Sequence, residues 1–132
     1  MKGRILMALA FTGLTACSAI TGGGATFKDY LLPGEPSLKV VQAEGRGSAF
    51  VANGSDRALD AVVVGLIGTV KANTVKGALS CTQQSETYTT CRVSTRLAPN
   101  DGLALLFTGS VTRSVLAFSY AGEAEVRVIP GR

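Results

Sequence analysis

The feature that most constrains this chain is a series of short apolar stretches separated by turn residues roughly every ten residues. The turns include Glu-Gly-Arg-Gly at 44–47, Asn-Gly-Ser-Asp at 53–56 and Ala-Pro-Asn-Asp-Gly at 98–102, which are residue types that reverse a chain. No segment after residue 30 shows the apolar stripe of an amphipathic helix. We therefore expect an all-β fold with these strand candidates: Leu38–Gln42, Ser48–Ala52, Leu59–Val70, Gly77–Thr82, Tyr88–Leu97, Leu103–Thr108, Ser114–Tyr120 and Glu123–Ile129.

Two of the candidate strands alternate clearly in polarity, as half-buried strands do. In the first, one face carries Thr89, Cys91, Val93, Thr95 and Leu97. In the last strand, Ala124, Val126 and Val128 oppose Glu123, Glu125 and Arg127. We expect the apolar face of each strand to point into the core and the two glutamates to face solvent.

Seven or eight such strands predict a single small antiparallel β-sandwich over residues 31–132. The stretches Asn53–Val64, Pro99–Phe107 and Tyr120–Val128 are similar to strands and turns of bacterial immunoglobulin-like or fibronectin-like modules. The resemblance covers residues 38–130 and implies an immunoglobulin-like sandwich. The chain has no tryptophan to fill the usual core position. An eight-stranded barrel and a transthyretin-like sandwich are the alternatives.

The first residues have the pattern of an export signal. Met1–Arg4 is a short basic head, and Ile5–Leu14 is an apolar run about half as long as the roughly 20 residues that cross a membrane. Leu14-Thr15-Ala16-Cys17 follows and resembles the lipobox of bacterial lipoproteins. The resemblance implies removal of residues 1–16 as a signal peptide and attachment of diacylglyceride, with acyl chains such as palmitate, to Cys17.

Residues 17–30 form the expected tether, because the triple glycine at 22–24 is too costly in entropy for a helix or a strand. The nine residues 18–26 span roughly 16 Å on average and about 30 Å when stretched. Lipoproteins kept at the inner membrane often carry Asp after the lipidated cysteine, whereas this chain has Ser18. By that resemblance we expect the protein on the outer membrane, on its periplasmic face or at the cell surface.

Cysteines occur at positions 17, 81 and 91. If Cys17 carries the lipid, Cys81 and Cys91 remain as an even pair in an oxidising compartment, and we expect them to form a disulfide. The competing interpretations are a metal site and a redox pair. Neither fits well, because the chain has no histidine and the spacing is not that of Cys-x-x-Cys.

The charge pattern gives little support for nucleic-acid binding. Removal of residues 1–16 from the 132-residue chain leaves 116 residues, with 11 basic and 9 acidic side chains. Lys71 and Lys76 flank one short segment, but neither a basic run nor interleaved aromatic residues accompany them. We expect no nucleic-acid partner, and we infer no small-molecule substrate.

The absence of histidine excludes a Ser-His-Asp or Cys-His nucleophile system and a histidine-bound zinc. Two weaker constellations remain. Ser37 and Lys39 share one face of a strand, as a lysine-activated serine requires. Glu123 and Glu125 would lie about 6.6–7 Å apart along an ideal strand, near the separation of paired glycosidase carboxylates. We favour an ordinary exposed strand in both cases and expect no enzymatic activity.

Metal and phosphate sites are also poorly supported. Asp56, Asp60 and Asp101 lie in or beside turns and are candidates for a calcium site, but they do not form a recognisable calcium loop. Gly22–Gly24 is not followed by the lysine and Ser/Thr of a phosphate-binding loop. We expect no metal and no cofactor.

Several strands are apolar on both sides, namely Val62–Ile67, Leu105–Phe107 and Val115–Phe118. Such strands are either buried on both faces or present their outer face to a partner. We therefore expect a lipid-anchored, non-enzymatic structural or accessory protein that docks to a larger envelope assembly. The alternative is a surface-exposed binding module (a receptor blocker, adhesin or inhibitor), for which Tyr88 offers the best anchoring side chain.

Overall fold

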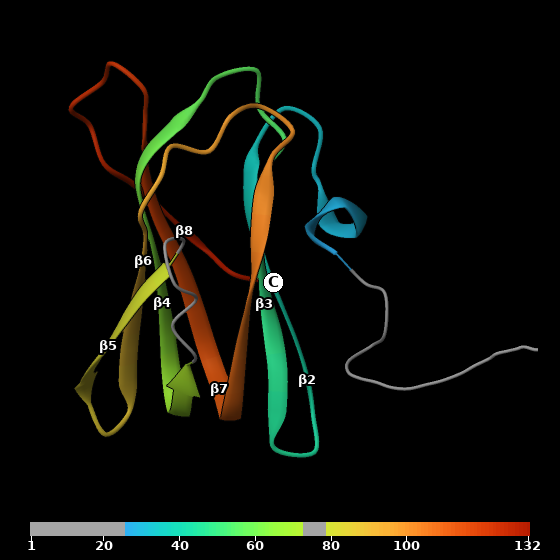
Figure 1. Ribbon diagram of the computed structural model, residues 1–132, viewed down its shortest axis with the longest axis vertical. Helices are drawn as coiled ribbons and strands as arrows, with labels where there is room; N and C mark the ends of the chain where they lie inside the picture. The colour runs from blue at the N-terminus through green and yellow to red at the C-terminus, as the bar shows by residue number, and fades with distance from the viewer. Residues whose placement is uncertain (1–25, 73–78) are drawn as a thin grey trace, which may run out of the picture.

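The computed structural model describes residues 26–72 and 79–132, so the expected signal peptide at 1–16, Cys17 and residues 18–25 lie outside the described residues. The expected all-β fold is confirmed (Figure 1). In chain order the elements are the 3-10 helix η2 (Phe27–Tyr30) and the strands β2 (Pro36–Ala43), β3 (Arg46–Asn53), β4 (Leu59–Ala72), β5 (Leu79–Ser85), β6 (Tyr88–Val93), β7 (Gly102–Tyr120) and β8 (Arg127–Pro130). Within these two described ranges, no helix has the length and apolar character needed to cross a bilayer.

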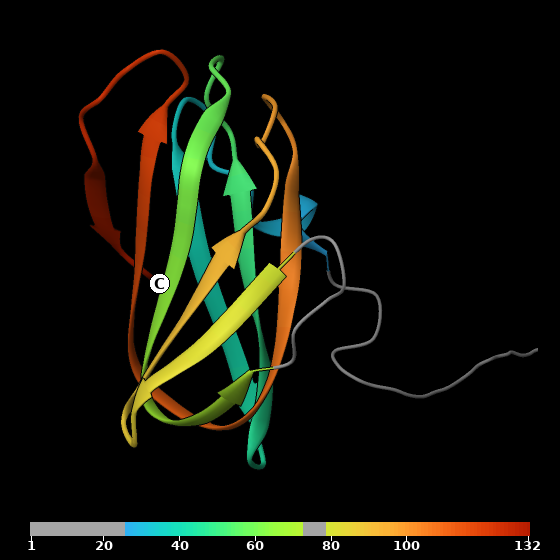
Figure 2. The ribbon, with the colours of Figure 1, turned by 60° about the vertical axis from the view of Figure 1, so that its left-hand side comes forward.

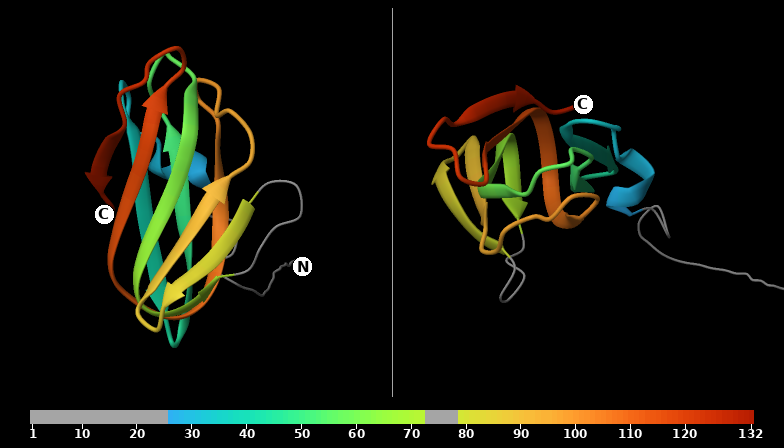
Figure 3. Two further views of the ribbon diagram at one scale, coloured as in Figure 1. Left: turned by 90° about the vertical axis from the view of Figure 1, so that its left-hand side faces the viewer. Right: turned by 90° about the horizontal axis from the view of Figure 1, so that it is seen from above.

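The described strands form one open antiparallel sheet of seven strands in the order β2-β3-β7-β4-β6-β5, with β8 added to β7. The first part of β7 pairs with β3, whereas Val115–Phe118 at its end pairs with β8. β4 follows β7 for most of its length but pairs with β6 only over Val63–Ile67. The sheet therefore folds over along β4 and β7 into a sandwich-like arrangement, with β2 and β3 on one side and β5 and β6 on the other (Figures 2 and 3).

Two glycines allow the bend of the long strands. Gly68 has a φ of 142° and Gly109 a φ of 101°, which L side chains rarely adopt. A Cβ at Gly68 would meet the carbonyl oxygen of Ser110, and one at Gly109 would meet that of Thr69. The sequence predicted two strands, 103–108 and 114–120. That division was wrong, because Gly109 bends the chain without reversing it, and β7 runs through both segments.

One apolar cluster fills the space between the two halves of the sheet. On β4, Val62, Val64 and Leu66 are fully buried. The alternation predicted for β6 is confirmed at Cys91 and Val93, which are also buried. The remaining buried members come from every part of the sandwich and include Leu38, Ala49, Val51, Leu59, Val70, Leu79, Leu97, Leu105, Phe107, Val111, Leu116 and Phe118.

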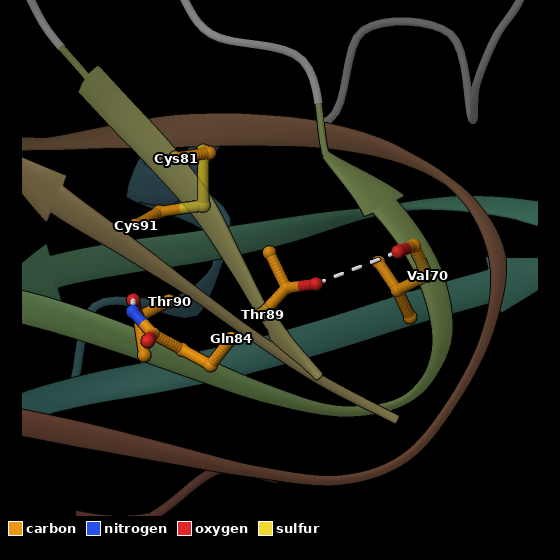
Figure 4. The surroundings of a disulfide bond; sticks show 6 residues. All are labelled: Val70, Cys81, Gln84, Thr89, Thr90 and Cys91. Atoms are coloured by element: carbon orange, nitrogen blue, oxygen red, sulfur yellow. Dashed lines mark hydrogen bonds between the residues drawn. A yellow bond between two sulfur atoms is a disulfide. The ribbon is translucent and has the colours of Figure 1, made fainter. Parts of the chain in front are cut away.

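The predicted disulfide between Cys81 and Cys91 is confirmed (Figure 4). The two cysteines are direct cross-strand partners in the β5–β6 pair, with 4.0 Å between their Cα atoms. Cys91 is fully buried in the core cluster, and Cys81 packs against that cluster. The disulfide therefore attaches β5, the last strand in the sheet order, to the core.

The helix η2 lies within the range 17–30 that the sequence assigned to the tether. The Thr26 side chain caps it by accepting a hydrogen bond from the Lys28 N–H, while the Thr26 N–H donates to Asp29. The Tyr30 ring packs on Phe50 of β3, with 5.0 Å between the ring centroids. The Ser37 hydroxyl donates to the Tyr30 carbonyl oxygen at 3.2 Å. These contacts attach the start of the described chain to the outer face of β3.

The last strand differs from its prediction. β8 covers only Arg127–Pro130, and residues 123–126 lie outside it. Val126 and Val128 are 62% and 63% exposed, whereas Ile129 packs against the core. The prediction that the valines point into the core was therefore wrong. Ile129, whose side chain lies on the opposite face of β8 from Val128, makes the inward contact of this short strand instead.

Candidate functional site

The outer face of the half-sheet that carries β5, β6 and β8 presents an apolar band. Since successive side chains alternate across a strand, the fully buried Val62, Val64 and Leu66 leave Val63 and Ile67 on the opposite, half-buried side of β4. The cross-strand partners of this side extend the band over four strands. We call it the Tyr88 face, and its members are Val63, Ile67, Tyr88, Val115, Ala117 and Val128.

Gly65 shapes the centre of the Tyr88 face. A Cβ at this position would meet the Cγ2 atom of Val115 and would lie 3.3 Å from the hydroxyl oxygen of Tyr88. The aromatic side chain therefore lies across the space that the glycine leaves on β4, as aromatic residues do over glycines in sheets. Tyr88 is still 37% exposed, so one side of it is available to a partner.

Polar and basic groups surround this apolar centre. Arg92 and Arg113 are exposed and are the cross-strand partners of Val63 and Ile67 respectively. The Gln84 side-chain amide donates to the Thr90 hydroxyl oxygen at 2.9 Å. An apolar centre within a polar rim is the usual arrangement of a protein–protein interface.

The candidate Ser37–Lys39 pair has no catalytic geometry. Ser37 is buried and its hydroxyl is hydrogen-bonded to the Tyr30 carbonyl. A lysine-activated serine needs a hydroxyl that reaches both its base and an accessible substrate. Ser37 instead attaches η2 to β2.

The two glutamates considered as a carboxylate pair belong to an ion-pair network. Arg57 donates to Glu123 at 2.7 Å, and Arg127 lies 3.6 Å from Glu123 and 3.4 Å from Glu125. The hydrogen bond from Arg57 is the largest influence on Glu123, and it holds the pKa of that carboxyl below its ordinary value of 4.5. A general acid needs a raised pKa, so Glu123 is poorly suited to that role.

The three candidate calcium ligands do not come together. Asp60 pairs with Arg96 at 2.8 Å, and Asp101 accepts a hydrogen bond from the Gly102 N–H. Over residues 26–72 and 79–132, no group of three or more acidic or cysteine side chains is placed to hold a metal ion. Of the two lysines considered for nucleic acid, Lys71 is exposed near the end of β4, and Lys76 lies outside the described residues.

The grooves on the described surface include two that are widely open to solvent. One of ≈ 380 Å³ lies between β2 and the second part of β7, with Arg113 and Arg132 as its ionisable side chains. The other, of ≈ 390 Å³, is lined by Lys71 and Glu86 among others. Neither groove contains the carboxylate pair or the Ser–Lys pair that the sequence suggested.

Gln42 and Asn53 have structural roles that the sequence did not reveal. Asn53 joins two turns through its hydrogen bonds to Arg57 and Leu97, and Gln42 joins two strands. The Gln42 side-chain amide donates to the Val111 carbonyl at 2.7 Å and accepts from the Val111 N–H at 2.9 Å. It thereby reproduces the two hydrogen bonds of a strand pair between β2 and the bend of β7. Such partners are distant in sequence, so no local pattern indicates them.

Comparison with known proteins gives little help. No protein-family model matches the chain, and no curated protein matches it. Two crystal structures of the GH20 exo-β-N-acetylglucosaminidase from Vibrio harveyi, one in complex with N-acetylglucosamine and one of an inactive mutant, are similar to it with a TM-score of 0.46 and 16% identity. Each match covers 74% of this chain and only 17% of the enzyme chain. A likeness of this extent gives no information on function.

Proposed function

We propose that this chain is a lipid-anchored cell-envelope protein that acts as a non-enzymatic structural or accessory component and docks to a larger envelope assembly. The lipobox-like Leu14-Thr15-Ala16-Cys17 supports the anchor, and Ser18 favours the outer membrane. The Tyr88 face supports docking and is the observation on which the proposal chiefly rests. A contiguous exposed apolar patch on a sheet commonly marks an interaction site.

The position of the Tyr88 face suits a tethered protein. η2 and the start of the described chain lie on the β3 side of the molecule, whereas β5 and β6 lie on the other side (Figure 1). A membrane anchor that precedes η2 therefore leaves the Tyr88 face directed away from the tether and accessible to an envelope protein.

The anchor is tested by the intact mass and membrane association of the protein and of its Cys17→Ser variant. We expect the wild type to lack residues 1–16 and to carry acyl chains, whereas Cys17→Ser remains an uncleaved precursor without lipid. A Cys17→Ser protein with the same mass and the same membrane association as the wild type would show that Cys17 is not the anchor.

Docking is tested with two valines of almost equal exposure. Val128 lies on the Tyr88 face, and Val126 lies in the loop before β8. We expect Val128→Arg to abolish co-purification of a cross-linked envelope partner, because a charge that becomes buried in an interface must be desolvated. Val126→Arg is the matched control and is expected to retain the partner. Equal recovery with both variants would exclude this face as the docking site.

The alternative proposal is a surface-exposed binding module that uses Tyr88 as its anchor. Tyr88 favours it because tyrosine combines a large apolar surface with a polar hydroxyl and is enriched in binding sites. A cysteine placed at exposed Val126 and labelled in intact cells by a membrane-impermeant thiol reagent separates the two possibilities. Labelling is expected only if the domain is displayed outside the cell.

A further inference from the structure

A second apolar patch lies on the outer face of the other half-sheet. In the pairing register, Val41 of β2 lies opposite Ser48 of β3, and Ser48 lies opposite Leu106 of β7. Leu106 is 55% exposed and Val41 is 42% exposed, and the neighbouring Ala104 is exposed as well. We call this surface the Leu106 face. Leu106 and Val41 lie on strands separated by β3, with the small side chain of Ser48 between them, and such exposed aliphatic side chains are favourable to cover.

The described chain begins on this same side. Tyr30 of η2 packs on Phe50, and a Cβ at Gly102 would meet the ring of Phe27. Phe50 and Gly102 belong to the outer side of β3 and β7, as Leu106 does. η2 thus covers one end of this side and leaves the end with Leu106 and Val41 uncovered.

Basic side chains outnumber acidic ones on and beside the Leu106 face. The ionisable side chains on the strands of this face are Lys39, Arg46 and Lys71. Lys39 lies opposite Phe50, and Arg46 and Lys71 both lie opposite Thr108. Acidic side chains beside them include Glu44, in the turn between β2 and β3, and Glu86, which lines a groove together with Lys71 and Thr108. An excess of positive charge around exposed aliphatic side chains suits a surface that combines negative charge with an apolar interior.

We propose that the Leu106 face lies on the headgroups of an anionic lipid membrane, with Leu106 and Val41 reaching toward the acyl chains and the three cations binding lipid phosphates. This inference rests on the anchor at Cys17 proposed above. Residues 18–26 extend to about 30 Å at most, so the anchor holds η2, and with it this face, within reach of the bilayer. The domain then lies on its membrane in one orientation, and the Tyr88 face points away from it.

The absence of tryptophan from the chain allows a direct test. Leu106→Trp and Val128→Trp each introduce a single indole on one of the two faces. The full mature protein with its lipid is reconstituted in vesicles of phosphatidylethanolamine and phosphatidylglycerol, with and without bromine on the acyl chains. We expect brominated lipid to quench Trp fluorescence several-fold more strongly in Leu106→Trp than in Val128→Trp, because bromine quenches an indole only at short range.

The role of charge is tested in the same vesicles. Replacing Lys39, Arg46 and Lys71 together by glutamine in the Leu106→Trp protein is expected to reduce the quenching severalfold, and so are vesicles without phosphatidylglycerol or a high salt concentration. Retention on the vesicles is expected to stay unchanged, because the acyl chains provide it.

The outcomes separate this inference from the proposed anchor. If the intact mass shows acylated Cys17 and Leu106→Trp is quenched no more than Val128→Trp, the lipid-facing orientation is wrong and the anchor stands. If the mass shows no acyl chains, the anchor is wrong, and the lipid-facing orientation that rests on it is overturned as well. A photo-cross-linker at position 106 that reacts in cells with one protein instead of lipid would also overturn the lipid-facing orientation.

Discussion

Asn53 shows how one buried side chain holds two distant turns together. Its amide nitrogen donates to the carbonyls of Arg57, Leu97 and Ala98, and its carbonyl oxygen accepts from the N–H and the hydroxyl of Ser55. The sequence identified 53–56 as a turn because Asn, Gly, Ser and Asp favour reversal. It did not reveal that Asn53 is fully buried, since its partners at 97 and 98 come close only in the folded chain.

Asn53→Ala is expected to lower the free energy of unfolding by about 2–4 kcal/mol, because it leaves several buried groups without their hydrogen-bond partner. Chemical denaturation of the variant and of wild type measures the difference. Gln84→Ala removes an amide of similar chemistry from an exposed position and is expected to change stability by less than about 0.5 kcal/mol. Similar losses in both variants would contradict the structural role of Asn53.

Glu123 gives a prediction about pH. Because its pKa is lowered in the folded protein, its contribution to stability is fully present above the ordinary value of 4.5 and is lost as the pH falls through the folded-state pKa. Arg57→Gln removes the largest cause and is expected to raise the Glu123 pKa toward its ordinary value. Arg127→Gln is expected to raise it less. An NMR titration of the Glu123 carboxyl carbon measures both, and an unchanged pKa in Arg57→Gln would contradict this explanation.

At the scale of elements, the sequence predicted strands well where both ends carry turn residues. β3 and β4 contain the predicted ranges Ser48–Ala52 and Leu59–Val70. It failed where a glycine bends a strand, as at Gly109 in β7, because a bend and a turn use the same residue type. It also failed at β8, where four residues are too few for alternation to fix which side chains face the core.

The disulfide between β5 and β6 is expected to stabilise the fold by about 2–3 kcal/mol, because it closes a short loop in the unfolded chain. Denaturation of the Cys81→Ala/Cys91→Ala double variant measures this contribution. Ser80→Ala, at an exposed neighbouring position, is the control and is expected to lie within about 0.5 kcal/mol of wild type. Wild type under reducing conditions is expected to match the double variant, and full stability in the reductant would contradict the prediction.

At the scale of the whole molecule, both outer faces of the sandwich carry exposed apolar side chains. The sequence raised this possibility from strands that are apolar on both sides, and the structure divides their residues between the core and the two faces. Leu105 and Phe107 are buried while Leu106 is exposed. Which residues join into one patch depends on the pairing of β8, β7, β4 and β6, which the sequence did not specify. The Tyr88 face was therefore foreseen only through Tyr88 and the apolar runs.

Docking through the Tyr88 face is tested most directly by a photo-cross-linking residue placed at Val128 in living cells, with one at Leu106 as the comparison. We predict that position 128 gives a saturating adduct with one envelope protein, which Val115→Arg in the same chain abolishes, and that position 106 gives no protein adduct. An adduct from position 106 with none from position 128, or no protein adduct from either position, would contradict docking through the Tyr88 face.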